Sequence, residues 1–168
     1  MLPRTPARQV LASVLLLFSF ATSAPARSAQ GPIGGIQTKE YGTGAGYCSP
    51  PIMSLSWDPI GYGLVVTLKG ITPCPNYPIT EHWLIYGADL FETPYPLESQ
   101  LFSPGAELYI KPFDALGPFA GSTSFQAVPN DPAMLGAPIT LQAIVGYGSN
   151  PMLNELGVSQ GQLVVFIP

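Results

Sequence analysis

The sequence predicts an all-β protein, a single antiparallel β-sandwich of about seven or eight short strands, immunoglobulin-like or jelly-roll-like. Twenty prolines and 18 glycines among 168 residues exclude long helices. Short β-type runs recur between clusters of turn residues, which is typical of a sandwich. Hydrophobic residues make up 46% of the chain and charged residues only 10%, so the chain is too apolar to be disordered. Its length predicts one domain.

Residues 1–29 have the three parts of a secretory signal peptide. Two arginines precede an apolar run at 10–20, and small residues follow as far as Ala29. The run has about 11 residues, whereas a membrane-spanning helix needs about 20, so a retained anchor is the weaker interpretation. We expect cleavage within 24–30, with Ala26 favoured. The expected location is outside the cell or in the cell envelope, the periplasm included.

The mature chain is acidic. From Gln30 onward it holds three lysines, no arginine and ten acidic residues, a net charge of −7. Such a domain has no basic surface for nucleic acid and does not suit an anionic membrane. No later stretch is long and apolar enough to span a membrane. We therefore expect neither nucleic acid nor a membrane span for the mature protein.

Cys48 and Cys74 are predicted to form a disulfide, because two cysteines in one small exported domain usually pair. Their spacing does not match a zinc ribbon, and a single histidine is too few for the usual Cys/His metal sites. The aspartates are scattered, so no calcium-binding run is present, although loops could still assemble a site. The expectation is that no cofactor and no metal are bound.

The order of elements follows from local patterns. We expect residues 30–47, rich in glycine, to be a flexible segment with one short strand at Ile36–Tyr41, and residues 48–168 to be the sandwich domain. Asn130–Gly136 predicts a short helical turn, with Asn or Asp as cap, an early Pro and a terminal Gly. The other predicted strands are Ile52–Trp57, Gly63–Lys69, Thr80–Tyr86, Ala106–Lys111, Gly121–Ala127, Ile139–Val145 and Gln162–Ile167.

Alternation gives several of these strands one core face. Leu108 and Ile110 share a face, with charged residues on the other. In the strand Ile139–Val145, the alternate apolar residues oppose Thr140 and Gln142. The nearly continuous apolar runs at 64–68 and 163–167 are expected in central strands.

The last fifty residues carry a recognisable pattern. Ala127-Val-Pro-Asn-Asp-Pro-Ala-Met-Leu-Gly136 precedes Ile139-Thr-Leu-Gln-Ala-Ile, and Leu156-Gly-Val-Ser-Gln-Gly-Gln-Leu-Val-Val follows. This resembles a β-sandwich module that recurs in secreted and cell-surface bacterial proteins, over about residues 42–168 and loosely at 71–118. The module has no defined activity. The resemblance therefore implies a secreted module and supplies no catalytic residue.

Catalysis is not favoured by the remaining residues. His82 is the only histidine, and no Gly-x-Ser-x-Gly motif accompanies it, so we interpret it as structural or merely exposed. Asp58, Asp114 and Asp131 have the pattern of turn residues rather than of a catalytic pair. We therefore expect a protein that is not an enzyme.

Aromatic residues are the best candidates for a binding surface. Trp57 and Trp83 are expected in the core. Tyr62, Tyr77 and Tyr95 are the candidate ligand- or partner-facing residues, the last two held in proline-rich connections. The function favoured is association, with other copies of the chain, cell-surface components or glycans, as a cell-envelope, adhesion or matrix component. A carbohydrate-binding module is the alternative, and a secreted hydrolase is less favoured.

Overall fold

A computed structural model describes residues 33–46, 49–70, 78–99, 101–148 and 156–168. The predicted signal peptide, Cys48, Cys74 and Tyr77 lie outside these residues, so export and the disulfide stay predictions. The elements are β1 (Gly35–Tyr41), β2 (Pro51–Asp58), β3 (Gly63–Gly70), β4 (Ile79–Gly87), β5 (Asp89–Pro96), β6 (Glu107–Lys111), β7 (Asp114–Ala120), β8 (Thr123–Ala127), the 3-10 turn η1 (Pro132–Met134), β9 (Pro138–Tyr147), β10 (Leu156–Val158) and β11 (Gly161–Ile167).

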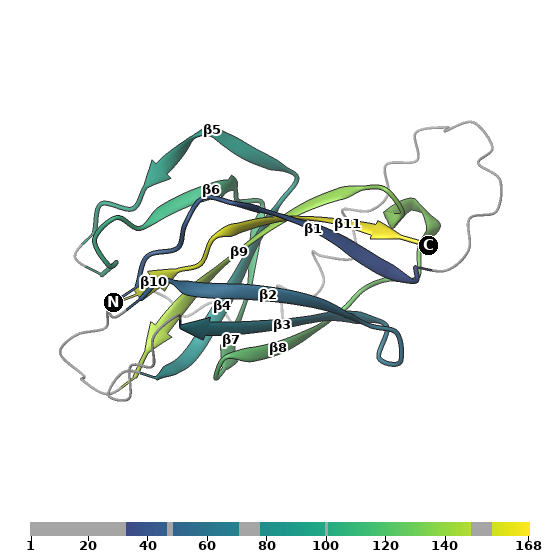
Figure 1. Cartoon of the computed structure of the whole chain (residues 1–168), viewed down its shortest axis with the longest axis horizontal. Helices are drawn as coiled ribbons and strands as arrows, with labels where there is room; N and C mark the ends of the chain where they lie inside the picture. The colour runs from purple at the N-terminus through teal and green to yellow at the C-terminus, as the bar shows by residue number, and fades with distance from the viewer. Residues whose placement is uncertain (1–32, 47–48, 71–77, 100, 149–155) are drawn as a thin grey trace, which may run out of the picture.

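The strands form three antiparallel sheets, which confirms the predicted all-β sandwich class (Figure 1). The large sheet has the order β1-β11-β9-β4-β7, and β10 also pairs with β9. A three-stranded sheet, β2-β3-β8, packs on one face of the large sheet, and this contact is called the core interface. The pair β5-β6, called the ribbon, lies on the other face.

All the predicted strands are present, with their ends shifted by one or two residues. The sequence did not predict β5, β7 or β10. Two of these strands contain prolines, Pro94 and Pro96 in β5 and Pro118 in β7. A proline in a sequence usually counts against predicting a strand there. Both are edge strands, where the missing N–H does not interrupt a ladder.

The predicted strand near the amino terminus is β1, and it pairs with β11 without interruption from Gly35–Ile167 to Tyr41–Gly161. The folded domain therefore includes this part of the glycine-rich segment 30–47. The predicted turn is also confirmed as η1. The Asp131 side chain caps it by accepting a hydrogen bond from Ala133 N, and Gly136 follows with a positive φ of 76°.

The core interface holds the main apolar cluster. Alternate residues of β9 point into it, and Leu84 of β4 and the even residues of β11 join them. Met53 and the even residues of β3 come from the opposing sheet. The buried members are Ile33, Met53, Leu64, Val66, Leu68, Leu84, Leu135, Leu141, Ala143, Val145, Val164 and Phe166.

The second face of β9 is also buried, which the alternation did not predict. Thr140 and Gln142 were expected to oppose the core face, but they are 1% and 0% exposed beneath the ribbon. The Gln142 amide accepts a hydrogen bond from Tyr109 N (2.9 Å) and donates to Glu107 O (2.8 Å). Thr140 donates to the carbonyl of Asp89 (3.3 Å). Polar side chains thus fix the ribbon to the large sheet.

Candidate functional site

The ribbon carries an irregularity that holds two aromatic side chains, an exposed Tyr95 and a half-buried Phe91. Leu90 of β5 is paired with Ile110 of β6, and Tyr95 is paired with Leu108. Four residues of β5 therefore stand opposite one residue of β6, and β5 bends away from β6 in a large bulge (Figure 1). Phe91 and Tyr95 lie at the two ends of this bulge. Their rings stack at a centroid distance of 6.0 Å and an angle of 27°, and we call them the aromatic pair.

Tyr95 is exposed, with 57% of its surface accessible. It had been expected in a proline-rich connection, but it lies within β5. The proline-rich sequence did not indicate a strand here because only the pairing with β6 reveals it. No hydrogen bond joins its hydroxyl to the residues that the structure describes.

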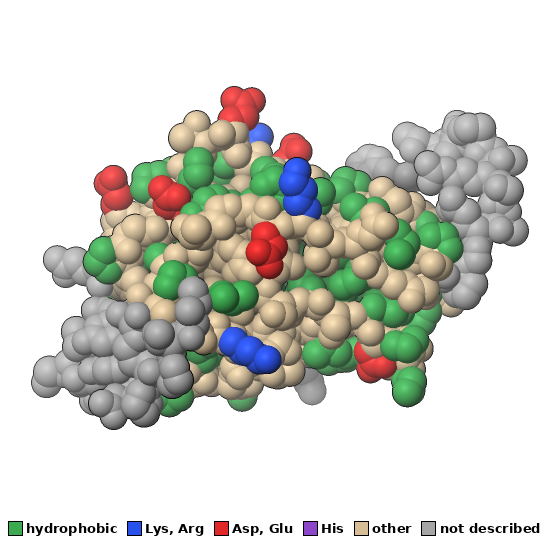
Figure 2. Space-filling model, in the orientation of Figure 1, with side chains coloured by type: hydrophobic (Ala, Val, Ile, Leu, Met, Phe, Trp, Pro, Cys, Tyr) green, Lys and Arg blue, Asp and Glu red, His purple; other side chains and the backbone are tan. Residues whose placement is uncertain are grey.

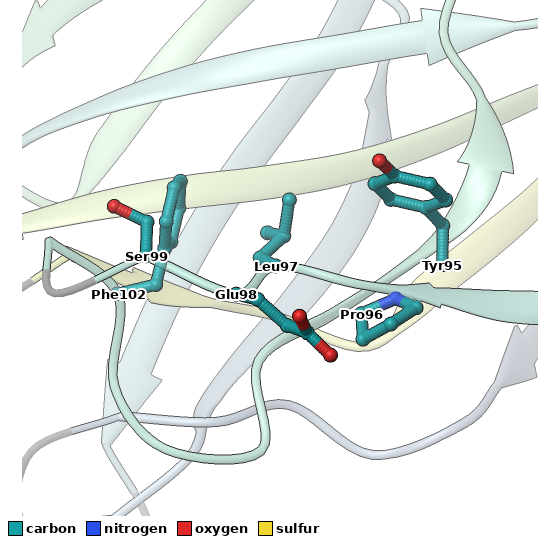
Figure 3. A pocket seen from close by; sticks show the side chains of 6 residues that line it. All are labelled: Tyr95, Pro96, Leu97, Glu98, Ser99 and Phe102. Atoms are coloured by element: carbon teal, nitrogen blue, oxygen red, sulfur yellow. The ribbon is translucent and has the colours of Figure 1, made fainter.

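An open pocket of about 470 Å³ adjoins the aromatic pair (Figure 3). Tyr95 at the end of β5 and Leu97 and Phe102 in the segment that follows point to the same side, while Glu98 points to the opposite side. Leu97 and Phe102 also pack against a small buried cluster of Ala45, Ala106 and Val158. The pocket therefore has an anchored apolar base and a charged residue at its margin. Its lining residues are Tyr95, Pro96, Leu97, Glu98, Ser99 and Phe102.

The surroundings of the pocket are acidic. The ribbon and its connection carry Asp89, Glu92, Glu98 and Glu107, and Lys111 is the one basic residue among them. Figure 2 shows acidic side chains along the part of the molecule that the ribbon occupies. Most of the other surface in this view is uncharged. The field around the pocket thus repels anions.

Tyr62 has a different environment from Tyr95. Its ring packs edge-on against Trp57 at 5.1 Å. Its hydroxyl donates to the Asn130 side chain and accepts from Ile33 N (3.0 Å). These contacts occupy Tyr62 within the protein, so we do not include it in the candidate site.

Trp57 and Trp83 lie on different faces of the sandwich. Trp57 packs against the main cluster, as predicted, and meets Phe166 edge-on at 6.0 Å. Trp83 is half-buried on the face of β4 turned away from that cluster. Tryptophan therefore contributes to the core at only one of the two expected positions.

His82 is fully buried and bonded through both ring nitrogens. Nδ1 lies 2.8 Å from Gly121 O, and Nε2 lies 2.8 Å from the Ser124 hydroxyl. Because a carbonyl only accepts, Nδ1 carries the hydrogen and Nε2 accepts from Ser124. These bonds hold the corner between β7 and β8 against β4. The sequence left open whether His82 is structural or merely exposed, and the structure shows that it has a structural role.

The carboxylates predicted in turns are used by the backbone. Asp58 Oδ1 accepts from Ile60 N, Asp131 caps η1, and Asp114 Oδ1 accepts from Ala115 N at the start of β7. Within the part of the chain that the structure describes, no three His, Cys, Asp or Glu residues gather as metal ligands. No described helix has the length and apolar character needed to cross a membrane.

The polar residues Ser159, Gln160 and Gln162 near the carboxyl end form hydrogen bonds within the fold. Ser159 Oγ accepts from Ala143 N (2.9 Å) and donates to Gln160 O (2.8 Å). The side chain of Gln160 accepts from Met53 N (3.1 Å) and donates to Met53 O (3.0 Å), and Gln162 also donates to Met53 O. These bonds thus tie β2 to the large sheet.

Sequence reasoning missed Phe91, Leu97 and Phe102. Pro94, between Phe91 and Tyr95, is compatible with an edge strand or a bulge, but it carries no signal for the stacking of the two rings. The contacts of Leu97 and Phe102 had no signal in the local sequence.

No protein-family model, curated protein or solved structure matches this chain. The resemblance of its carboxyl-terminal part to a bacterial surface module therefore stays a prediction.

Proposed function

We propose that this chain is an exported, non-catalytic β-sandwich protein that acts by association, as a cell-envelope, adhesion or matrix component. The observation that carries the proposal is the aromatic pair on the bulge of β5. Its two rings stack on each other rather than in a core, and Tyr95 is largely exposed. Exposed aromatic residues of this kind are enriched where proteins bind other molecules.

The chemistry of the other candidate residues supports association over catalysis. His82 is the only histidine, and both of its nitrogens are bonded inside the fold. Asp58 and Asp131 serve turns. Hydrolysis is therefore the less supported function. Export rests on the sequence of residues 1–29, whose basic, apolar and small parts are those of a signal peptide.

Binding of fluorescently labelled mature protein to cells and extracellular matrix of the producing organism tests the proposal, together with light scattering for self-association. We expect saturable binding or a particle larger than a monomer. Tyr95→Ala should reduce the association, whereas Phe113→Ala should not. Phe113 is a matched control because it is 69% exposed and lies outside the ribbon, between β6 and β7. A strictly monomeric protein that binds neither cells nor matrix contradicts the proposal.

A further inference from the structure

We propose that the aromatic pair and the adjoining pocket bind a neutral glycan, with one pyranose ring stacked on Tyr95. This inference rests on the proposed function and names the ligand class for the same site. It also selects among the glycans considered above, because the acidic residues of the ribbon disfavour an anionic polymer.

The geometry of the aromatic pair fits a sugar ring. Phe91 stacks on Tyr95, which fixes the orientation of the Tyr95 ring, while more than half of that side chain is accessible. Pyranose rings have an apolar face of C–H groups, and an aromatic face is its natural complement. Leu97 and Phe102 extend the apolar base on the same side of the segment (Figure 3).

Hydrogen-bonding groups lie around this apolar base. The Tyr95 hydroxyl has no partner among the described residues. Glu98 also belongs to the pocket lining, but its carboxylate points to the side opposite Tyr95. Ser99 Oγ accepts from Leu101 N (3.2 Å) and keeps its own hydrogen for a ligand. The hydroxyls of Tyr95 and Ser99 can serve the hydroxyl groups of a sugar, which both donate and accept.

The charge of the site selects against anionic ligands. Glu98 belongs to the pocket lining, and Glu107 is paired with Pro96 of that lining. Asp89 and Glu92 lie farther along β5, and Lys111 is the single cation of the ribbon. Sulfated, phosphorylated or uronate-rich polymers are repelled by this field, while a neutral glycan is not. The pocket volume of about 470 Å³ is typical of small-molecule sites, and its open form admits an internal unit of a longer chain.

The site is held in place before a ligand arrives. Pro94 and Pro96 fix the backbone on both sides of Tyr95. Tyr95 is paired with Leu108, and Leu97 N donates to Ala106 O (2.9 Å). A site with few rotamers and backbone states to lose binds with a smaller entropic cost.

Isothermal calorimetry of the mature full-length protein against defined polysaccharides tests the inference. The neutral probes are cellohexaose, laminarin, xylan oligomers and yeast mannan, and the anionic controls are heparin and polygalacturonate. We expect at least one neutral probe to bind and both anionic controls to bind more weakly. Tyr95→Ala should weaken binding about tenfold, which is the effect of losing one good aromatic contact.

Matched variants separate stacking from folding. Tyr95→Phe keeps the ring and should stay within about threefold of the wild type, and Phe113→Ala should leave binding unchanged. Circular dichroism and thermal unfolding establish that each variant is folded. Absence of binding to every neutral probe overturns the inference, as does binding that is indifferent to Tyr95→Ala or stronger for the anionic controls. If cells still bind Tyr95-dependently while no glycan does, the proposed function stands and only the glycan assignment falls.

Discussion

The large sheet is buried on both faces, but the two interfaces are built from different residues. At the core interface, Leu141, Ala143 and Val145 of β9 meet apolar side chains of the three-stranded sheet. On the opposite face of the same strand, Thr140 and Gln142 bond to the backbone of the ribbon. One strand thus contributes an apolar contact and a hydrogen-bonded contact at alternate positions.

The difference shows what each interface does. Apolar contacts are non-directional and depend on the area removed from water, so the core interface supplies most of the stability. Hydrogen bonds to backbone groups have defined geometry, so the Gln142 amide fixes where the ribbon lies. The position of the ribbon matters because it carries the aromatic pair and the pocket.

The largest expected effect lies in the core interface. Phe166 is 1% exposed within the main cluster, and Phe166→Ala should lower the free energy of unfolding by about 3–5 kcal/mol, because it leaves a cavity between the two sheets. Urea denaturation measures this loss. The control is Phe125→Ala, at a residue that is 45% exposed and should change stability by less than about 1 kcal/mol. Equal effects of the two changes would contradict the assignment of the core.

The second largest loss of stability is expected where the ribbon packs on the large sheet, a contact called the ribbon interface. Gln142→Met keeps the length of the side chain but removes its bonds to Tyr109 N, Glu107 O and Ser159 O. We expect a loss of about 2–4 kcal/mol, since buried backbone groups are left without partners. Hydrogen exchange at the Tyr109 amide should accelerate more than at strands β3 and β11. A loss no larger than that of Gln37→Met, at an exposed position of β1, would show that the amide does not hold the ribbon.

Loss of the hydrogen bonds of His82 in β4 should lower the free energy of unfolding by an intermediate amount. His82→Leu removes the bonds to Gly121 O and to the Ser124 hydroxyl. The expected loss is about 1–3 kcal/mol, because these groups stay buried without a partner. The double variant with Ser124→Ala tests this cause: the two losses should not add, since both changes disrupt the same contact. Additive losses would exclude a shared contact.

Alkaline pH should weaken the core interface through Tyr147, which packs against the main cluster. Burial raises the pKa of Tyr147 from 10.0 to about 12. Below pH 10 the phenol is protonated in both the folded and the unfolded state, so its contribution to the free energy of unfolding is complete. Between pH 10 and about 12 the unfolded chain loses the proton first, so stability falls as pH rises.

Comparison of the wild type with Tyr147→Phe from pH 9 to pH 12 measures this contribution. Solvent screening of a partly exposed ring limits the difference to about 1 kcal/mol. The wild type should lose stability relative to the variant as the pH rises above 10. Parallel curves over this range would show that Tyr147 ionises equally in both states.

The smallest effect on stability is expected at the aromatic pair. Tyr95→Ala should change the free energy of unfolding by less than about 0.5 kcal/mol, because the side chain is largely exposed and no backbone group depends on it. Thermal unfolding of the variant measures the change. A loss comparable to that of Gln142→Met would mean that Tyr95 belongs to the ribbon interface rather than to a binding surface.

Local patterns determined the class of the fold and most of its elements. Alternation in β6 and β9, the apolar runs of β3 and β11 and the turn before Gly136 were predictable because each depends on residues close in sequence. The turn roles of Asp58 and Asp131 were predictable for the same reason, since their acceptors and donors are two residues apart. Tyr95 could be selected as a surface aromatic from its proline neighbours.

Only the tertiary structure decided which faces meet. Gln142 is polar and alternates with apolar residues, so the local sequence predicts an exposed side chain at this position. Its burial depends on Tyr109, which is 33 residues away. The stacking of Phe91 on Tyr95 likewise depends on the register between β5 and β6, which leaves four residues of β5 opposite one residue of β6. Long-range contacts of this kind leave no local signal, because the free energy that selects them comes from the assembled layers rather than from neighbouring residues in the chain.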